Sequence, residues 1–143
     1  MLYKIPKFFT ADFLKLIMEM GHGEELLICD ANFPHKTMNK ETVVLAGCDV
    51  AQILKETLEF FPLDQTVEYA AVSMDSARES GAYDVYEKLL AEAVIPGKIT
   101  TIPRFDFYER AAGVAGIVLT SDIRKGGNII IKKGVVNTTN YEF

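Results

Sequence analysis

The sequence contains few of the residues that metal, redox and disulfide chemistry require. Its 143 residues include two cysteines, Cys29 and Cys48, and two histidines, His22 and His35. These four residues do not have the spacing of zinc ligands, and Cys29 lies in an apolar run, where a thiol behaves as a small hydrophobe. The sequence therefore predicts no metal, no cofactor, no disulfide framework and no cysteine nucleophile.

Long apolar runs and blocks of positive charge are also missing. No run approaches the roughly 18 residues of a membrane span, and residues 1–6 lack the apolar core of a signal peptide. The formal net charge is −5, which argues against nucleic acid or an anionic membrane as a partner. We therefore expect a cytoplasmic protein whose ligand is neutral or small.

Common enzyme motifs are absent as well. Gly126-Gly127 alone is neither a dinucleotide fingerprint nor a phosphate-binding loop, and the sequence has no Gly-x-Ser-x-Gly nucleophile elbow. These absences disfavour a redox or acyl-transfer enzyme, and proton transfer remains as the chemistry that the chain can support.

The pattern of apolar residues predicts one α/β domain that covers residues 1–143. With 49% hydrophobic and 24% charged residues, the composition is typical of a folded domain. Helices are expected over 10–20, 49–61, 83–94 and 104–111, and strands over 26–29, 42–45, 66–74, 99–103, 114–119 and 129–131. This alternation predicts a layered fold with a mainly parallel central sheet flanked by helices. The polar tail 137–140 is expected to fray.

One short stretch places two ionisable side chains at the two ends of a predicted strand. His22 stands between Gly21 and Gly23 before the apolar run 26–29, and Asp30 follows that run directly. The glycines allow another molecule to approach the imidazole, a group that takes and returns protons near neutral pH. The same pattern also fits a helix cap, in which Gly21 ends the preceding helix.

Other polar residues also lie beside predicted strand ends. Ligands gather at the carboxyl ends of parallel strands, and Asp30, Asp75, Arg104 and Asn128 all neighbour such ends. A carboxylate, a guanidinium and an amide suit the hydroxyl groups of a polyol. Each residue also has a structural explanation, since Asp30 and Asn128 favour turns and Arg104 suits a surface ion pair.

Several blocks of the sequence resemble the ribose pyranase / fucose mutarotase family. They are Gly-His-Gly-Glu-Glu at 21–25, Asp-Ala-Asn-Phe-Pro at 30–34, Arg-Phe-x-Phe-Tyr-Glu-Arg-Ala at 104–111 and Gly-Asn at 127–128. They occur in the family's order over nearly the whole chain. The first and third blocks are more similar to the fucose mutarotase branch than to the ribose pyranase branch.

The resemblance implies an enzyme that interconverts the α and β anomers of a reducing monosaccharide without a cofactor or metal. It implies that L-fucose is preferred over D-ribose as the substrate. It also implies that His22 is the general acid and base and that the sugar-binding residues are Asp30, Arg104 and Asn128. It also implies a homo-oligomeric ring, a decamer of stacked pentamers, with the site near a subunit boundary. A non-catalytic sugar-binding module and a structural ring protein are the alternatives.

One position departs from the family pattern. The family usually carries a tyrosine two residues before the asparagine, and this chain has Gly126 there. Either the surface that stacks on the sugar comes from elsewhere in the protein, or the preferred sugar differs.

Overall fold

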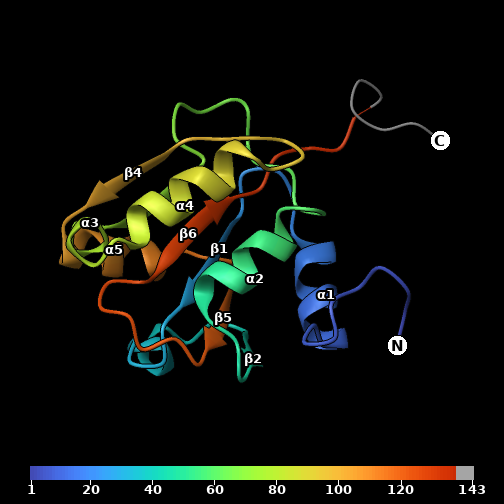
Figure 1. The fold of residues 1–143 in the computed structure, drawn as a ribbon, viewed down its shortest axis with the longest axis horizontal. Coiled ribbons are helices and arrows are strands. Elements are labelled where there is room, and N and C mark those ends of the chain that lie inside the picture. Colours follow the sequence, from blue (N-terminus) through green and yellow to red (C-terminus); the bar gives the residue numbers. More distant parts are fainter. Residues whose placement is uncertain (138–143) are drawn as a thin grey trace.

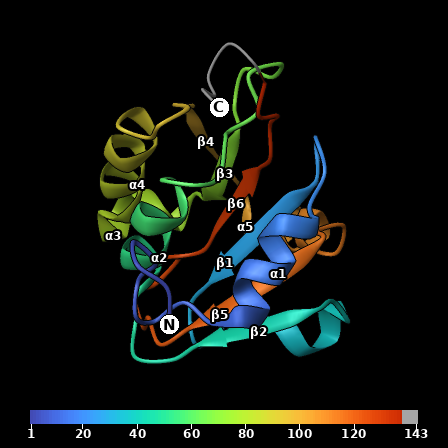
Figure 2. The same cartoon turned by 90° about the vertical axis from the view of Figure 1, so that its right-hand side faces the viewer.

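A six-stranded sheet forms the centre of the protein (Figure 1). The computed structural model describes residues 1–137, so the predicted fraying of 137–140 falls almost entirely outside the described residues. The strands are β1 (Glu25–Cys29), β2 (Thr42–Leu45), β3 (Ala71–Met74), β4 (Ile99–Ile102), β5 (Gly116–Thr120) and β6 (Ile129–Lys132). Their order across the sheet is β2-β5-β1-β6-β3-β4, seen from bottom to top in Figure 2.

The sheet is mainly parallel, as predicted, with one exception in its middle. β1 and β2 both pair parallel with β5, and β3 pairs parallel with β4. β6 runs antiparallel to both of its neighbours, β1 and β3. The amino end of β6 therefore lies at the edge of the sheet where β1 and β3 have their carboxyl ends, and this places Asn128 beside Asp30.

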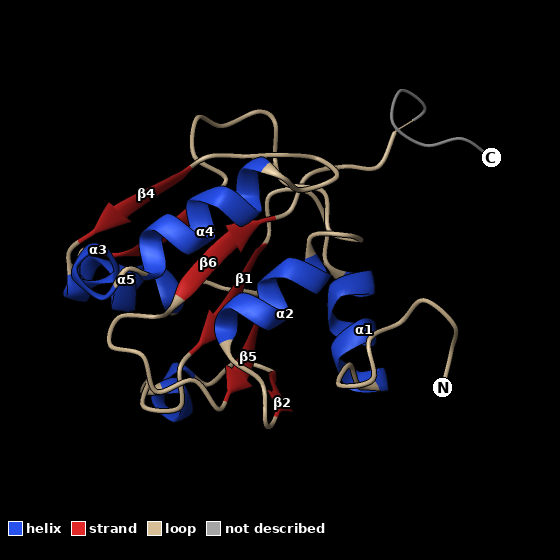
Figure 3. Ribbon diagram, viewed as in Figure 1, coloured by secondary structure: helices blue, strands red, loops and turns tan. Residues whose placement is uncertain are grey.

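Helices cover the two faces of the sheet unequally (Figure 3). One face packs against α1 (Ala11–Glu19), α2 (Val50–Thr57) and α4 (Ala82–Ala91), whereas α5 (Arg104–Ala111) covers the other. The short helix α3 (Ser76–Ser80) precedes α4, and a 3₁₀ turn, η1, spans His35–Met38. None of these helices, within the described part of the chain, is long and apolar enough to cross a membrane.

Capping residues in the sequence set where the first two long helices begin. The Thr10 hydroxyl accepts a hydrogen bond from the Phe13 backbone N–H at 3.1 Å, so α1 starts where the sequence predicts. Asp49 and Gln52 form a reciprocal capping box at the start of α2, in which each side chain accepts from the other's backbone N–H.

The apolar runs of the strands divide between two cores because successive side chains point to opposite faces. In β1, Leu26 and Ile28 pack under α1, α2 and α4, whereas Leu27 and Cys29 pack on the side of α5. All four are fully buried. β1 is therefore a rigid central strand, and groups attached at its two ends are held at opposite edges of the sheet.

Some predicted boundaries were wrong. The predicted strand 66–74 is a strand only over Ala71–Met74, because Asp64 accepts from the Thr66 backbone N–H and holds the chain in a turn. The predicted helix 49–61 ends at Thr57, after which Glu59 and Phe60 donate to carbonyls three residues back.

Candidate functional site

A polar pair lies at the edge of the sheet where β1 ends and β6 begins. The Asn128 side-chain amide donates to Asp30 Oδ2 at 3.0 Å, and its Oδ1 accepts from the Asp30 backbone N–H at 2.8 Å. The Asn32 backbone N–H donates to Asp30 Oδ1 at 2.9 Å. Both Asp30 and Asn128 are buried, at 6% and 3% exposure. Two residues that are 98 positions apart in the sequence therefore form one rigid acceptor and donor unit.

Burial determines the protonation behaviour of Asp30. It raises the pKa of the carboxyl group, although hydrogen bonds from Asn32 and Asn128 act in the opposite direction. A carboxylate with limited hydration gains strongly from a ligand hydroxyl that donates to it, because such a charge-assisted bond is stronger than one between neutral groups. Asp30 is thus suited to bind a polyol.

Arg104 joins Asp30 and Asn128 in lining one pocket with a volume of about 370 Å³. This volume is within the usual range for small-molecule sites. Arg104 is the first residue of α5, and its Nε donates to the Tyr108 hydroxyl at 3.0 Å. It forms no ion pair within residues 1–137, so the surface ion-pair explanation for this residue finds no support. Asp75, also named from the sequence, does not line the pocket.

Aromatic rings form part of the pocket wall. Phe33 and Tyr108 both line it, with their rings edge to face at a centroid distance of 5.4 Å. Gly126 also lines the pocket at φ +67°, and a Cβ there would clash with the Ser76 hydroxyl and lie 3.0 Å from Ser76 Cβ. In this conformation the β5–β6 turn leaves no room for a side chain at 126 unless Ser76 moves. The aromatic surface comes from α5 and the loop after β1.

His22 lies at the opposite edge of the sheet, before β1 begins. The five residues of β1 alone span about 16 Å, so within one chain the imidazole does not reach the pocket that holds Asp30, Arg104 and Asn128. The structure thus brings three of the four predicted site residues together and leaves His22 apart from them. Its side chain is 46% exposed and accessible to another molecule.

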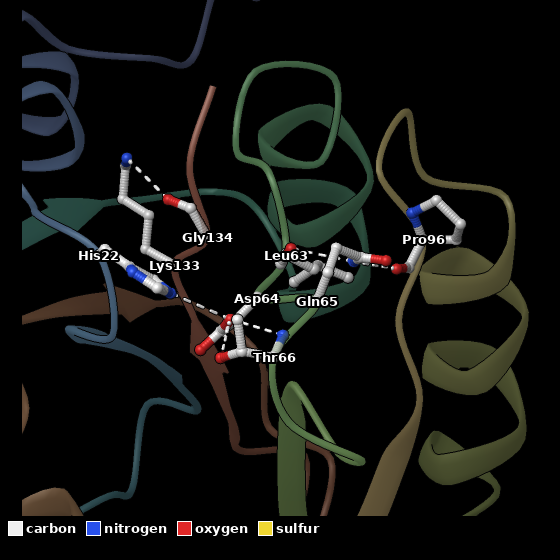
Figure 4. A network of polar contacts seen from close by, with 8 residues as sticks. All are labelled: His22, Leu63, Asp64, Gln65, Thr66, Pro96, Lys133 and Gly134. Atoms are coloured by element: carbon white, nitrogen blue, oxygen red, sulfur yellow. Dashed lines mark hydrogen bonds and ion pairs between the residues drawn. The ribbon is translucent and has the colours of Figure 1, made fainter. Parts of the chain in front are cut away.

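His22 has a partner that the sequence analysis missed. Its Nε2 lies 3.1 Å from Asp64 Oδ1 (Figure 4), and Asp64 is 4% exposed. Within residues 1–137 the His22 side chain hydrogen-bonds to Asp64 and to no carbonyl of α1, whose C-cap is Met20, so the helix-cap explanation finds no support. Asp64 is 42 positions away in a loop that comes alongside because the Asp64 backbone N–H donates to the Lys132 carbonyl. No spacing in the sequence indicates this pairing.

Hydrogen bonds hold Asp64 in its ionised form. Burial acts to raise its pKa, but the backbone N–H and hydroxyl of Thr66, at 2.9 and 2.8 Å, together with His22, lower the pKa below its ordinary value. An ionised carboxylate accepts hydrogen bonds and donates none. We therefore assign the His22 proton to Nε2, which leaves a lone pair on Nδ1. This is the arrangement of a histidine oriented as a base.

One other hollow on the described surface is less suited to chemistry. A hollow lined by Phe60, Phe61, Val94 and Val135 is largely apolar and lacks the donors that bind a polyol. Within residues 1–137 no group of three His, Cys, Asp or Glu side chains is arranged to hold a metal ion. The expected absence of a metal and of a cofactor stays a prediction.

Comparisons with known proteins place the chain among sugar-related relatives. The model of the RbsD / FucU transport protein family matches residues 3–136. A Mus musculus protein named fucose mutarotase is 36% identical over 143 residues, covering 93% of this chain and 94% of its own. The chain is therefore similar to this relative over nearly its whole length.

Two solved structures share the fold. FucU from Bifidobacterium longum has a TM-score of 0.86 and 34% identity, and the match covers 94% of this chain and 99% of that one. The fucose mutarotase from Streptococcus pneumoniae, solved in complex with L-fucose, has a TM-score of 0.87 and 33% identity, with 95% and 100% covered. Both matches confirm the layered architecture with a mainly parallel sheet that the sequence predicts.

Proposed function

The chain belongs to the RbsD / FucU family, and from that premise we propose that it is a sugar mutarotase that interconverts the α and β anomers of L-fucose. The observation that carries the proposal is the pocket in which a carboxylate, an amide and a guanidinium, from Asp30, Asn128 and Arg104, surround a volume of about 370 Å³. These groups suit sugar hydroxyls. The relative solved with L-fucose and the mouse relative named fucose mutarotase favour this sugar over D-ribose.

The proposed reaction passes through the open-chain aldehyde. A base takes the proton of the anomeric hydroxyl while an acid gives a proton to the ring oxygen, and the C1–O5 bond breaks. The aldehyde carbon then rotates and the ring recloses on its other face, which returns both protons. General acid–base catalysis of this kind contributes about 10²- to 10⁴-fold in rate.

His22 is the proton shuttle in this proposal, and Asp64 orients it. The hydrogen bond to the Asp64 carboxylate, 3.1 Å long, fixes the ring and stabilises the imidazolium that forms when Nδ1 accepts the proton. Asp30, Asn128 and Arg104 hold the hydroxyls so that the anomeric end alone moves, which is an orientation effect. Water or another side chain serves as the complementary acid.

The separation of His22 from the pocket leads to an oligomeric site. Each chain presents an exposed His22, backed by the buried Asp64, at one edge of the sheet and an open sugar pocket at the other. We therefore assign His22 of one copy to the pocket of a neighbouring copy, in a head-to-tail contact that closes into a ring. A decamer of two stacked pentamers in the cytoplasm is the assembly and location that we propose.

Saturation-transfer NMR on L-fucose tests the function. The wild-type protein should accelerate exchange between the two anomer signals, and His22→Ala should abolish that acceleration because Nδ1 no longer takes the proton. His35→Gln is the control, since it changes the chain's second histidine, which lies outside the pocket lining and whose side chain hydrogen-bonds to the Phe33 carbonyl. Circular dichroism should show that both variants fold.

The same assay separates the alternatives. Faster exchange of D-ribose than of L-fucose would indicate a ribose pyranase. A protein whose melting temperature rises when sugar is added, but which does not accelerate anomer exchange, would be a binding module. If His22→Ala exchanges L-fucose as fast as wild type does, the assignment of His22 is wrong.

A further inference from the structure

Two buried hydroxyl groups bind the backbone on either side of the Asn128 Cα. The Tyr86 hydroxyl, from α4, donates to the Gly127 carbonyl at 2.5 Å, and the Ser73 hydroxyl, from β3, donates to the Asn128 carbonyl at 2.9 Å. Tyr86 and Ser73 are both at 0% exposure, and neither lines the sugar pocket. The peptide groups before and after Asn128 are therefore both held from inside the protein.

The Tyr86 hydroxyl is the polar end of a residue that otherwise packs in the apolar core. The ring lies in the cluster of buried residues between the sheet and α4, where a phenylalanine ring would fill nearly the same space. A buried hydroxyl costs stability unless it forms a hydrogen bond, and within residues 1–137 the Gly127 carbonyl is its one partner. Burial also raises the pKa of Tyr86, so the group keeps its proton and stays a donor. The hydroxyl therefore serves the segment that carries Asn128.

The segment held in this way precedes the regular part of β6. Pairing of β6 with β1 and β3 begins at Ile129, so Gly127 and Asn128 lie between that pairing and the turn. Gly127 has no side chain to pack, and its N–H donates to the Arg124 carbonyl within the turn itself, at 3.1 Å. The two buried hydroxyls thus connect this segment to α4 and β3.

Asn128 passes the position of this segment on to Asp30. Its Oδ1 accepts from the Asp30 backbone N–H at 2.8 Å, and its amide donates to Asp30 Oδ2 at 3.0 Å. The amide carries two N–H groups, so one stays available for a sugar hydroxyl. The directions of this N–H and of the Asp30 carboxylate therefore both depend on where the Asn128 backbone lies.

We propose that Tyr86 and Ser73 are positioning residues of the sugar site, which act through Asn128 to direct the hydroxyl-binding groups of Asn128 and Asp30 at the substrate. The inference rests on the proposed mutarotase function and adds two residues to its binding machinery. Neither side chain touches the sugar. Removal of one hydroxyl leaves a buried carbonyl without its donor, and the segment shifts because a buried carbonyl requires a partner. Asn128 and Asp30 then meet the sugar hydroxyls at poor angles, which weakens those hydrogen bonds.

Removal of one hydroxyl at a time tests the proposal. Tyr86→Phe and Ser73→Ala leave the side chains that line the pocket unchanged. Saturation-transfer NMR at increasing L-fucose concentration gives KM and kcat for anomer exchange, and isothermal titration gives Kd. For each variant we expect KM and Kd to rise by about tenfold, the effect of one charge-assisted hydrogen bond to a sugar hydroxyl. A lower kcat at unchanged KM and Kd would indicate only a loss of folded protein and would contradict the inference.

Tyr83→Phe is the matched control for Tyr86→Phe. It removes the same group from the same helix, but the Tyr83 hydroxyl donates to Glu87 Oε2 and to the Ile99 carbonyl, and Tyr83 does not line the sugar pocket. KM and Kd of this variant should keep their wild-type values. Circular dichroism at the assay temperature should show that all the variants are folded.

A double-mutant cycle shows whether the hydroxyls act through Asn128. Asn128→Ala removes the amide that binds Asp30 and should by itself weaken L-fucose binding. In that background Tyr86→Phe should change Kd by less than about twofold, because the group that it positions is gone. A further tenfold rise in Kd would show that Tyr86 affects binding by another route, and the assignment of a positioning role would be wrong.

Measuring binding and exchange together separates this inference from the proposed function. If the wild-type protein exchanges L-fucose while Tyr86→Phe and Ser73→Ala keep its KM and Kd, the inference fails and the mutarotase function stands. If the wild-type protein binds L-fucose without speeding exchange and both variants bind it about tenfold more weakly, the proposed function fails and the positioning role is supported. A wild-type protein that neither binds nor exchanges L-fucose would overturn both.

Discussion

At the level of single residues, Asp64 determines what His22 can do. The carboxylate is buried, accepts two hydrogen bonds from Thr66 and lies 3.1 Å from the imidazole. It therefore fixes which nitrogen of His22 carries a proton and supplies a negative charge beside the ring when that ring is protonated. His22 at 46% exposure stays accessible while its partner is shielded from solvent.

The lowered pKa of Asp64 predicts how stability depends on pH. Because the folded pKa lies below the unfolded one, the unfolded chain binds more protons on acidification. The stabilisation is complete above the unfolded pKa of about 3.9 and is lost as the pH falls through the lower folded pKa. Asp64→Asn should thus lower the free energy of unfolding by about 1–2 kcal/mol at pH 7 and by less near pH 3.

Urea unfolding of wild type and Asp64→Asn at both pH values measures this difference. Glu68→Gln is the control because Glu68 is an exposed carboxylate in the same loop region, and its effect should be small at both values. An equal loss of stability for Asp64→Asn at pH 7 and pH 3 would contradict the role of the ionised carboxylate.

At the level of elements, the turn between β5 and β6 shapes the pocket. Its residues 124–126 and 128 line the site, and Gly126 adopts φ +67° while its Cα lies against Ser76 at the start of α3. The turn and α3 therefore approach more closely than a side chain at 126 would allow. This close approach explains why the chain carries a glycine at the position where the sequence comparison leads us to expect an aromatic residue.

Two glycine substitutions separate the cost of backbone strain at positive φ from the cost of a steric clash with Ser76. Gly23 has φ +83° with nothing within 4 Å of an added Cβ, so Gly23→Ala introduces backbone strain alone. We expect it to cost about 1 kcal/mol, whereas Gly126→Ala, which adds a clash with Ser76, should cost about 2–4 kcal/mol. Urea unfolding of both variants provides the comparison. Equal losses would show that Ser76 moves aside and that packing does not require the glycine.

At the level of the whole molecule, β1 separates the two halves of the proposed site. The His22–Asp64 pair and the sugar pocket lie at opposite edges of one sheet, and both are open to a second molecule. In the proposed assembly a complete site forms only where two copies meet, so we expect catalysis to depend on assembly. A light-scattering mass equal to one chain would contradict this organisation.

Mixed assemblies test the shared site directly. His22→Ala and Arg104→Ala damage different halves, so a one-to-one mixture assembled at random should regain intact sites at about one quarter of the boundaries. Each variant alone should be inactive in L-fucose exchange. His22→Ala mixed with Asp64→Ala is the matched control, because both changes damage the same half and no boundary is restored. No recovery in the first mixture would place the whole site within one chain.

The residue order determined much of the fold and pointed to several residues that line the candidate pocket. Apolar runs bounded by turn residues predicted β1 and β6, because a short strand buried on both faces needs such a run. Thr10 and Asp49 predicted where α1 and α2 begin, because capping depends on residues close together in the sequence. Polar residues next to strand ends, Asp30 and Asn128 among them, were found for the same local reason.

Tertiary structure alone decided which of these residues meet. The antiparallel direction of β6 brings Asn128 to Asp30, and a loop bound to the Lys132 carbonyl brings Asp64 to His22; neither pairing follows from spacing. The net charge of −5 does not indicate that Arg104, Arg124 and Lys125 line one pocket with Asp30. Composition sums charges over the chain, whereas a ligand meets the field of the few groups that the fold places around it.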